Sequence, residues 1–139
     1  MSHFTKVATK INSLPALFKA LDALGLTYEV GSEALPATVT GYMHEAITAA
    51  VAIHLPGTKY GIGVVRADDG VNYELAGDWW GIETTTGKTE REIIDEIGAA
   101  YSLARVRVAC EEAGWAFEGE AVKQADGSIE LVAVQWGSQ

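Results

Sequence analysis

The segment Thr89–Gly114 places the strongest constraint on how this sequence can fold. Thr89 and Glu92 have the spacing of a capping box, in which each side chain bonds to backbone amides at the start of a helix. Gly114 readily adopts the left-handed conformation that ends a helix. Apolar residues recur between them at helical spacing, namely Ile93, Ile97, Ala100, Tyr101, Ala104 and Val108. We therefore predict one helix, about 36 Å long, lying across a small sheet.

A second, shorter helix is predicted over Ser13–Leu24. Ser13 is a favourable N-cap residue, Pro15 is tolerated in the first turn, and Gly25 follows the helix. The stripe expected to be buried contains Leu14, Leu17, Phe18, Leu21 and Leu24.

Most of the other segments have the residue pattern of β-strands. Strands are predicted over His3–Ile11, Tyr28–Val30, Thr38–Met43, Ala46–Leu55, Tyr60–Arg66 and Asn72–Trp80. Asp68-Asp69-Gly70 predicts a hairpin turn between the last two strands. A second hairpin is predicted from Ala116–Lys123 and Ser128–Trp136, closed around Asp126-Gly127.

This order of elements predicts an α+β fold. The strands and helices are segregated and joined by short turns, which favours a mainly antiparallel sheet over a parallel α/β arrangement. The 139 residues, 48% of them hydrophobic, match one globular domain with a core of its own. We expect residues 1–139 to form a single domain.

The net charge limits the classes of partner. With 19 acidic and 10 basic side chains, the chain carries a net charge of −9. Such a surface repels phosphate backbones and anionic membranes, so neither nucleic acid nor a membrane is expected as a partner. The same charge favours basic protein partners.

Cys110 is the only cysteine, so no internal disulfide can form. We therefore expect a reducing compartment such as the cytoplasm. The N-terminus lacks the apolar region of a signal peptide, and no apolar run is long enough to span a membrane. Glu111, Glu112 and a helix C-terminus beside Cys110 disfavour its thiolate, so a packing role is expected.

No catalytic, metal or cofactor signature is present in the sequence. His3, His44 and His54 lack the spacing of zinc ligands. Gly61 and Gly63 lack the third glycine and the following helix of a dinucleotide-binding loop. The many carboxylates are expected to form solvated faces, because acid–base chemistry requires a desolvated carboxylate. We therefore predict no catalytic residue, no metal and no cofactor.

Trp79 and Trp80 are the most suggestive pair in the sequence. Adjacent side chains of a strand point to opposite faces, so both cannot enter one core. An outward tryptophan is a typical anchor of protein interfaces, and Asp78 would add a polar rim. The alternative is that one ring caps the core while Glu83–Gly87 covers the other. Trp136 either extends the same surface or fixes the last strand.

Gly61 and Gly63 share one strand face, and Ala46, Ala50 and Ala52 share another. If these faces coincide, a patch of small side chains results. Close packing of a helix is the commoner use of strand glycine, and a ligand pocket is the alternative. In that second case the pocket would lie under Tyr60, Tyr73 and Tyr101.

The order of several short motifs resembles a known family. The N-terminal strand opens with Met1-Ser2-His3-Phe4, and Tyr60-Gly61-Ile62-Gly63 precedes Tyr73-Glu74-Leu75 and Asp78. Tyr101, Gly114 and the stretch from Asp126-Gly127-Ser128-Ile129 to Trp136 follow. The chain resembles the hypothetical chloroplast open-reading-frame thirty-five family, found in cyanobacteria and algal plastids and in other bacteria and phages. The resemblance implies a small soluble protein without established catalytic residues, located in the stroma if plastid-encoded.

These features predict a non-enzymatic interaction or assembly module that binds a protein partner or another copy of itself. Its surface would contain Asp78, Trp79, Trp80 and Trp136. The alternative is a small-molecule or cofactor-binding protein, enzymes included, that uses the sheet face around Gly61 and Gly63. A third interpretation, an accessory or substrate of a larger ATPase or phage assembly, differs from the first only in the partner.

Overall fold

The computed structural model describes the chain apart from residues 1–3, 118–121, 124–128, 131–132 and 136–139. The helices are α1 (Leu14–Ala23), α2 (Trp79–Thr86) and α3 (Glu90–Glu112), with a 3-10 turn at Tyr42–His44. The strands before α2 are β1 (Thr5–Ala8), β2 (Thr27–Val30), β3 (Ala37–Thr40), β4 (Ala46–Ala49), β5 (Val51–His54), β6 (Gly61–Arg66) and β7 (Tyr73–Gly77). Four short strands follow α3: β8 (Trp115–Phe117), β9 (Val122–Lys123), β10 (Ile129–Glu130) and β11 (Ala133–Gln135). The fold is α+β and mainly antiparallel, as predicted.

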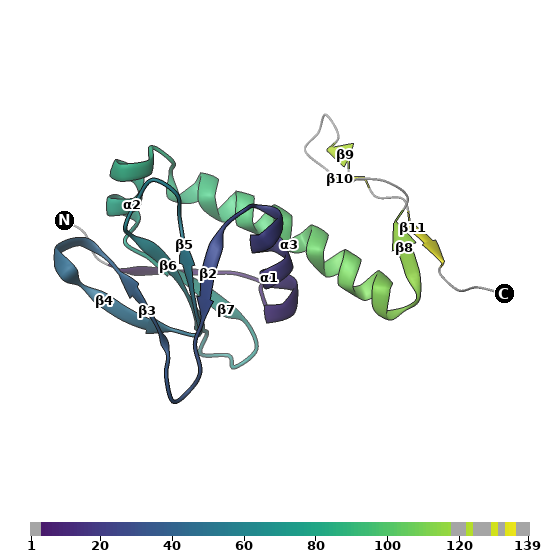
Figure 1. Ribbon diagram of the computed structural model, residues 1–139, viewed down its shortest axis with the longest axis horizontal. Coiled ribbons are helices and arrows are strands. Elements are labelled where there is room, and N and C mark those ends of the chain that lie inside the picture. The colour runs from purple at the N-terminus through teal and green to yellow at the C-terminus, as the bar shows by residue number, and fades with distance from the viewer. Residues whose placement is uncertain (1–3, 118–121, 124–128, 131–132, 136–139) are drawn as a thin grey trace.

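A five-stranded antiparallel sheet forms the centre of the structure (Figure 1). Its strand order is β1-β7-β6-β5-β2, so that β1 and β2 are the edge strands. Val64 in β6 lies opposite Val51 in β5 and Leu75 in β7, which aligns large aliphatic residues across three strands. The predicted hairpin joins β6 to β7. In its turn, backbone amides of Val71 and Asn72 donate to Asp69, and these bonds lower the pKa of that carboxyl.

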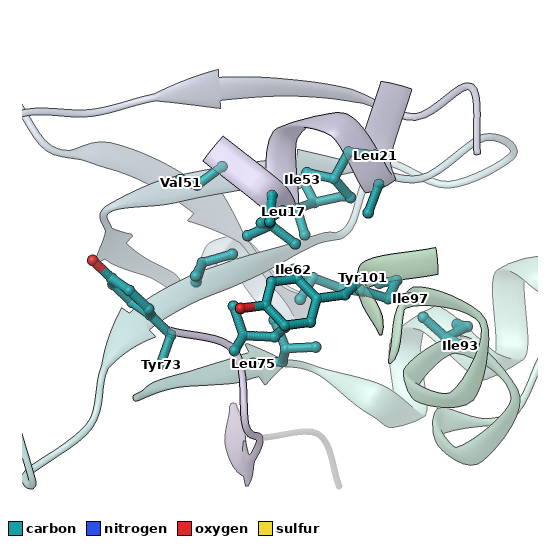
Figure 2. Packing of buried hydrophobic residues seen from close by; sticks show 14 of the residues in the cluster. Leu17, Leu21, Val51, Ile53, Ile62, Tyr73, Leu75, Ile93, Ile97 and Tyr101 are labelled. Atoms are coloured by element: carbon teal, nitrogen blue, oxygen red, sulfur yellow. The ribbon is translucent and has the colours of Figure 1, made fainter. Parts of the chain in front are cut away.

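Helices α1 and α3 cover one face of this sheet and bury the main core with it. Figure 2 shows side chains from both helices meeting the sheet. The labelled residues are Leu17, Leu21, Val51, Ile53, Ile62, Tyr73, Leu75, Ile93, Ile97 and Tyr101. Removing this much apolar surface from water is the main term that favours the folded state.

Helix α3 has the boundaries that its capping signals predict. The Thr89 side chain accepts from the Glu92 amide, the Glu92 side chain bonds back to Thr89, and Gly114 has φ +81°. Ile93, Ile97, Tyr101 and Ala104 of its predicted stripe are buried. The last turns of α3 continue beyond the sheet toward β8 and β11 (Figure 1).

The Tyr101 hydroxyl joins α3 to the start of α1. It accepts hydrogen bonds from the backbone amides of Asn12 at 3.0 Å and Ser13 at 3.1 Å, and it donates to the Asn12 side chain at 3.2 Å. The Ser13 side chain in turn accepts from the Ala16 amide and caps α1. One hydroxyl thus accepts the amide of the N-cap residue, which has no partner within the helix, and the amide of the residue before it.

The opposite face of the sheet is covered by the hairpin β3–β4, which forms a second, smaller core. Ala37, Val39 and Ala49 of the hairpin pack there with Ala52 of β5. A side chain on Gly63 would meet the Ala49 Cβ at 3.1 Å and the Val39 Cγ2 at 3.3 Å. Gly63 therefore permits close packing, as expected for strand glycine, but against a hairpin rather than a helix.

Two strand predictions were wrong in this region. Ala46–Leu55 is not one strand, because the chain bends at Ala50 and passes from the small hairpin into the central sheet. The Ala50 amide donates to the Val64 carbonyl, while the Ala50 carbonyl accepts from the Gly31 amide. The predicted strand Thr38–Met43 also ends early, because Tyr42–His44 turns back toward β4. Local periodicity did not show that the two halves of Ala46–Leu55 belong to different sheets.

The C-terminal segment has the hairpin pairing that was predicted. β8 pairs with β11 and β9 pairs with β10, both antiparallel. The predicted turn at Asp126-Gly127 lies outside the described residues.

Removing the Tyr101 hydroxyl tests the junction between α1 and α3. Tyr101→Phe leaves two backbone amides at the start of α1 without their acceptor, so we expect a loss of about 1–3 kcal/mol in unfolding free energy. Urea denaturation measures this loss. Tyr42→Phe is the control, because Tyr42 is 41% exposed and water can solvate its hydroxyl. Equal small effects of both substitutions would contradict the assigned role.

A matched pair of glycine substitutions tests the small core. Gly63→Val forces atoms into space held by Ala49, Val39 and Ile47, so we expect destabilisation by about 1–3 kcal/mol or more. Gly98→Ala adds a methyl group to α3 where, beyond its chain neighbours and the backbone of its own helix, no atom lies within 4 Å, and it should stabilise the protein by up to about 1 kcal/mol. Thermal unfolding of both variants checks the opposite signs. A Gly63→Val protein as stable as the parent would contradict the packing described here.

Candidate functional site

Asp78 is the buried centre of the candidate site. It is 0% exposed, and it is the only fully buried charged residue among those that the structure describes. Its Oδ2 accepts from the Tyr42 amide at 2.8 Å, and its Oδ1 accepts from the Gly81 amide at 3.2 Å. One carboxylate therefore joins the end of β7, the start of α2 and the tip of the β3–β4 hairpin.

The predicted strand Asn72–Trp80 ends earlier than expected, at Gly77. Asp78 is the N-cap of α2, so Trp79 and Trp80 lie in the first turn of a helix rather than on a strand. Aspartate is among the best N-cap residues because its carboxylate accepts the free amides of the first turn. The glycine at position 77 also leaves room for Trp79, because a Cβ there would lie only 3.1 Å from the Trp79 ring.

The two tryptophans have different environments. Trp79 is 6% exposed and packs in the main core, where its indole Nε1 donates to the Thr5 carbonyl at 3.1 Å. Trp80 is 50% exposed. The sequence predicted that one of the two rings faces outward, and Trp80 does so. The reason differs from the predicted one, because the start of helix α2, and not strand alternation, sets the direction of each ring.

Trp80 packs edge-on against Tyr42, a residue that sequence reasoning did not select. The two ring centroids are 5.5 Å apart, with an interplanar angle of 80°. Tyr42 is 41% exposed. Its position follows from the bond between its amide and Asp78, a contact across 36 residues of sequence that no local motif indicates.

Met43 is the third exposed residue of this region. Its backbone has φ 55° and ψ 39°, the only positive φ of a non-glycine residue among those described, and its side chain is 77% exposed. The turn that holds it is closed by the Gly41 amide donating to Glu45 and the Glu45 amide donating to Tyr42. We call Tyr42, Met43 and Trp80 the aromatic patch.

The five residues of the alternative pocket do not come together. Gly61 and Gly63 face the β3–β4 hairpin, whose side chains occupy the space above them. Tyr60, Tyr73 and Tyr101 are instead buried in the main core. The small-residue face is covered by protein, and it is not the open floor that this hypothesis required. Of the three alanines, Ala52 lies opposite Gly63, whereas Ala46 is in the hairpin.

Among the described residues, the remaining candidates form no catalytic or metal-binding cluster. Trp136 and His3 lie outside the described residues. No three His, Cys, Asp or Glu side chains gather as metal ligands in the part of the chain that the structure describes. On the acidic helix, Glu96 pairs with Lys88 at 3.1 Å and Asp95 with Arg91 at 3.5 Å. No described helix is both long enough and apolar enough to cross a membrane.

A family comparison shows to which family the chain belongs. The family described as "Protein of unknown function (DUF1257)" matches residues 20–132, which is more than half of the sequence. The chain belongs to this family. Comparisons with curated proteins and with solved structures gave no match. In this DUF1257 protein the matched span includes Asp78 and the whole aromatic patch.

Replacing Asp78 tests whether it organises the site. Asp78→Ala removes the cap of α2 and leaves the amides of Tyr42 and Gly81 without their acceptor, so we expect a loss of roughly 2–4 kcal/mol in unfolding free energy. Asp69→Ala is the matched control, because it also removes a carboxylate that accepts backbone amides, but in an exposed turn. Chemical denaturation should give a clearly smaller loss for Asp69→Ala. Equal losses would contradict a special role for Asp78.

Proposed function

We propose that this DUF1257 protein is a non-enzymatic interaction or assembly module, a single α+β domain that binds a protein partner through the aromatic patch. The observation that carries the proposal is the half-exposed Trp80 held edge-on against Tyr42. Tryptophan and tyrosine are enriched among the few residues that dominate binding energy at protein interfaces, and methionine is enriched in interface cores.

The way the patch is held supports this proposal. Asp78 fixes the Tyr42 backbone and the α2 helix start from which Trp80 projects. Binding by side chains that are already held in place loses little conformational entropy, so more of the contact energy contributes to affinity. Met43 adds an exposed, flexible thioether side chain, which adapts to irregular partner surfaces.

Charge supports a basic partner. The net charge of −9 attracts positively charged proteins and disfavours both nucleic acid and anionic membranes. Self-association must overcome the repulsion between two acidic copies, so a basic partner is favoured over a second copy. The resemblance to the hypothetical chloroplast open-reading-frame thirty-five family supports a role in the cytoplasm or the plastid stroma. An accessory role in a larger ATPase or phage assembly would use the same surface.

Native mass spectrometry of untagged protein, gently isolated from its host, tests the proposal. We expect additional mass of protein size, or a multiple of 14.8 kDa if the partner is another copy. Trp80→Ala and Tyr42→Ala should each weaken the affinity for the partner at least tenfold, the effect of losing an interface anchor worth more than about 1.4 kcal/mol.

Val71→Ala is the control, because Val71 is 57% exposed in the β6–β7 turn, at the opposite end of β7 from Asp78. This variant should bind like the parent protein. A complex that survives both aromatic substitutions would overturn the assignment of the surface.

A further inference from the structure

A second surface feature, separate from the aromatic patch, is an apolar pocket where α1 and α2 end against the start of α3. Ile93 and Ile97 of α3 form its buried floor, and the partly buried Leu26 and Leu55 form its walls. Leu24 lies at the lip and is 37% exposed. The sequence placed Leu24 in the buried stripe of α1, but it follows the helix as the C-cap residue and contacts the pocket instead.

The pocket is partly open to solvent and has a volume of about 200 Å³, which limits how much of a ligand it can bury. Sites for drug-sized ligands typically measure 300–1,000 Å³, so a nucleotide or a flavin is too large. An apolar cavity of about 150 Å³ already holds one benzene molecule. The volume therefore suits an aliphatic or aromatic body of about six to eight carbons.

The polar rim of the pocket is balanced in charge. Lys88 and Glu96 line the pocket, and the Lys88 Nζ lies 3.1 and 3.2 Å from the two Glu96 oxygens. A carboxylate head group would be attracted to Lys88 and repelled by Glu96. An ammonium head group would be attracted to Glu96 and repelled by Lys88. An uncharged hydroxyl or amide can accept from Lys88 or donate to Glu96 without either repulsion.

We propose that this pocket is a binding site for a small uncharged amphiphile, with an aliphatic body of about six to eight carbons and a hydroxyl or amide head. The body would contact Leu26, Leu55, Ile93 and Ile97, and the head would lie at the Lys88–Glu96 pair. The site is independent of the proposed protein interaction, because it shares no residue with the aromatic patch.

Titration of the full chain with a series of 1-alkanols, monitored by protein NMR, tests the proposal. From butanol to hexanol the affinity should rise about three- to fourfold per methylene, the value expected for burying each CH₂. It should stop rising near eight carbons, when the pocket is full. Hexanoate and hexylamine should each bind more weakly than hexanol.

Two charge variants test the role of the rim. Lys88→Met leaves Glu96 and should shift the preference toward hexylamine, whereas Glu96→Gln leaves Lys88 and should shift it toward hexanoate. Each shift should be up to about fivefold, because the pair is exposed and such ion pairs are weak. The hexanol affinity should stay within about twofold in both variants.

Leu24→Trp, which puts a larger side chain at the pocket lip, should reduce hexanol affinity more than tenfold. Val71→Trp, which adds the same ring at a distant exposed site, should have no effect. Circular dichroism checks that both variants fold, and Leu24→Phe replaces Leu24→Trp if the latter does not. The proposal is overturned if alkanols show no saturable binding, if affinity rises with chain length without a limit, or if the folded lip variant binds as tightly as the parent.

Discussion

The burial of one carboxylate, that of Asp78, is the constraint on which the surface architecture depends. An ionisable side chain with no exposed area is tolerated only when its oxygens are hydrogen-bonded, and both oxygens of Asp78 accept backbone amides. Satisfying this group ends β7, begins α2 and fixes the hairpin tip in one place. The inward direction of Trp79 and the outward direction of Trp80 follow from that arrangement. The backbone of the aromatic patch is thus positioned by a buried polar group, and the edge-on contact between Tyr42 and Trp80 then holds the two rings together.

The elements that sequence reasoning predicted well are those whose signals are local. The Thr89 capping box, the Ser13 cap and the Asp69-Gly70 turn are each complete within a few residues, and the structure has all three. The failures occurred where a distant segment decides the outcome. Asp78-Trp79-Trp80 continues an alternating pattern, although Asp78 is also a local N-cap signal. The contact between Asp78 and the Tyr42 amide, brought close by the fold, has no local signal. Tyr42 and Met43 carry no motif, so half of the candidate site could not be found from the sequence.

The two faces of the central sheet are packed by different means. Large aliphatic residues such as Ile53, Ile62 and Leu75 meet the helices, whereas Ala52 and Gly63 meet a hairpin. Small side chains let two sheets approach closely, and the hairpin side chains fill the space directly above Gly63. The pocket instead lies at the end of the helical layer, where α1 stops short of covering Leu26 and Leu55. Helix α2 separates the two surface features, with Trp80 in its first turn and Thr86 of the pocket at its end.

The strand order also determines when the fold can be completed during synthesis. Strands β5, β6 and β7 pair with their neighbours in the chain, so this meander can assemble as soon as Gly77 has left the ribosome. Strand β1 waits for β7, because Val7 pairs with Leu75, and the start of α1 waits longer still for the hydroxyl of Tyr101. Contacts of such long sequence separation form late, because the chain must first close a large loop. Strand β1 is made before the meander but is among the last elements to be fixed in place, and until then the exposed edge of β7 is open to pairing with another chain.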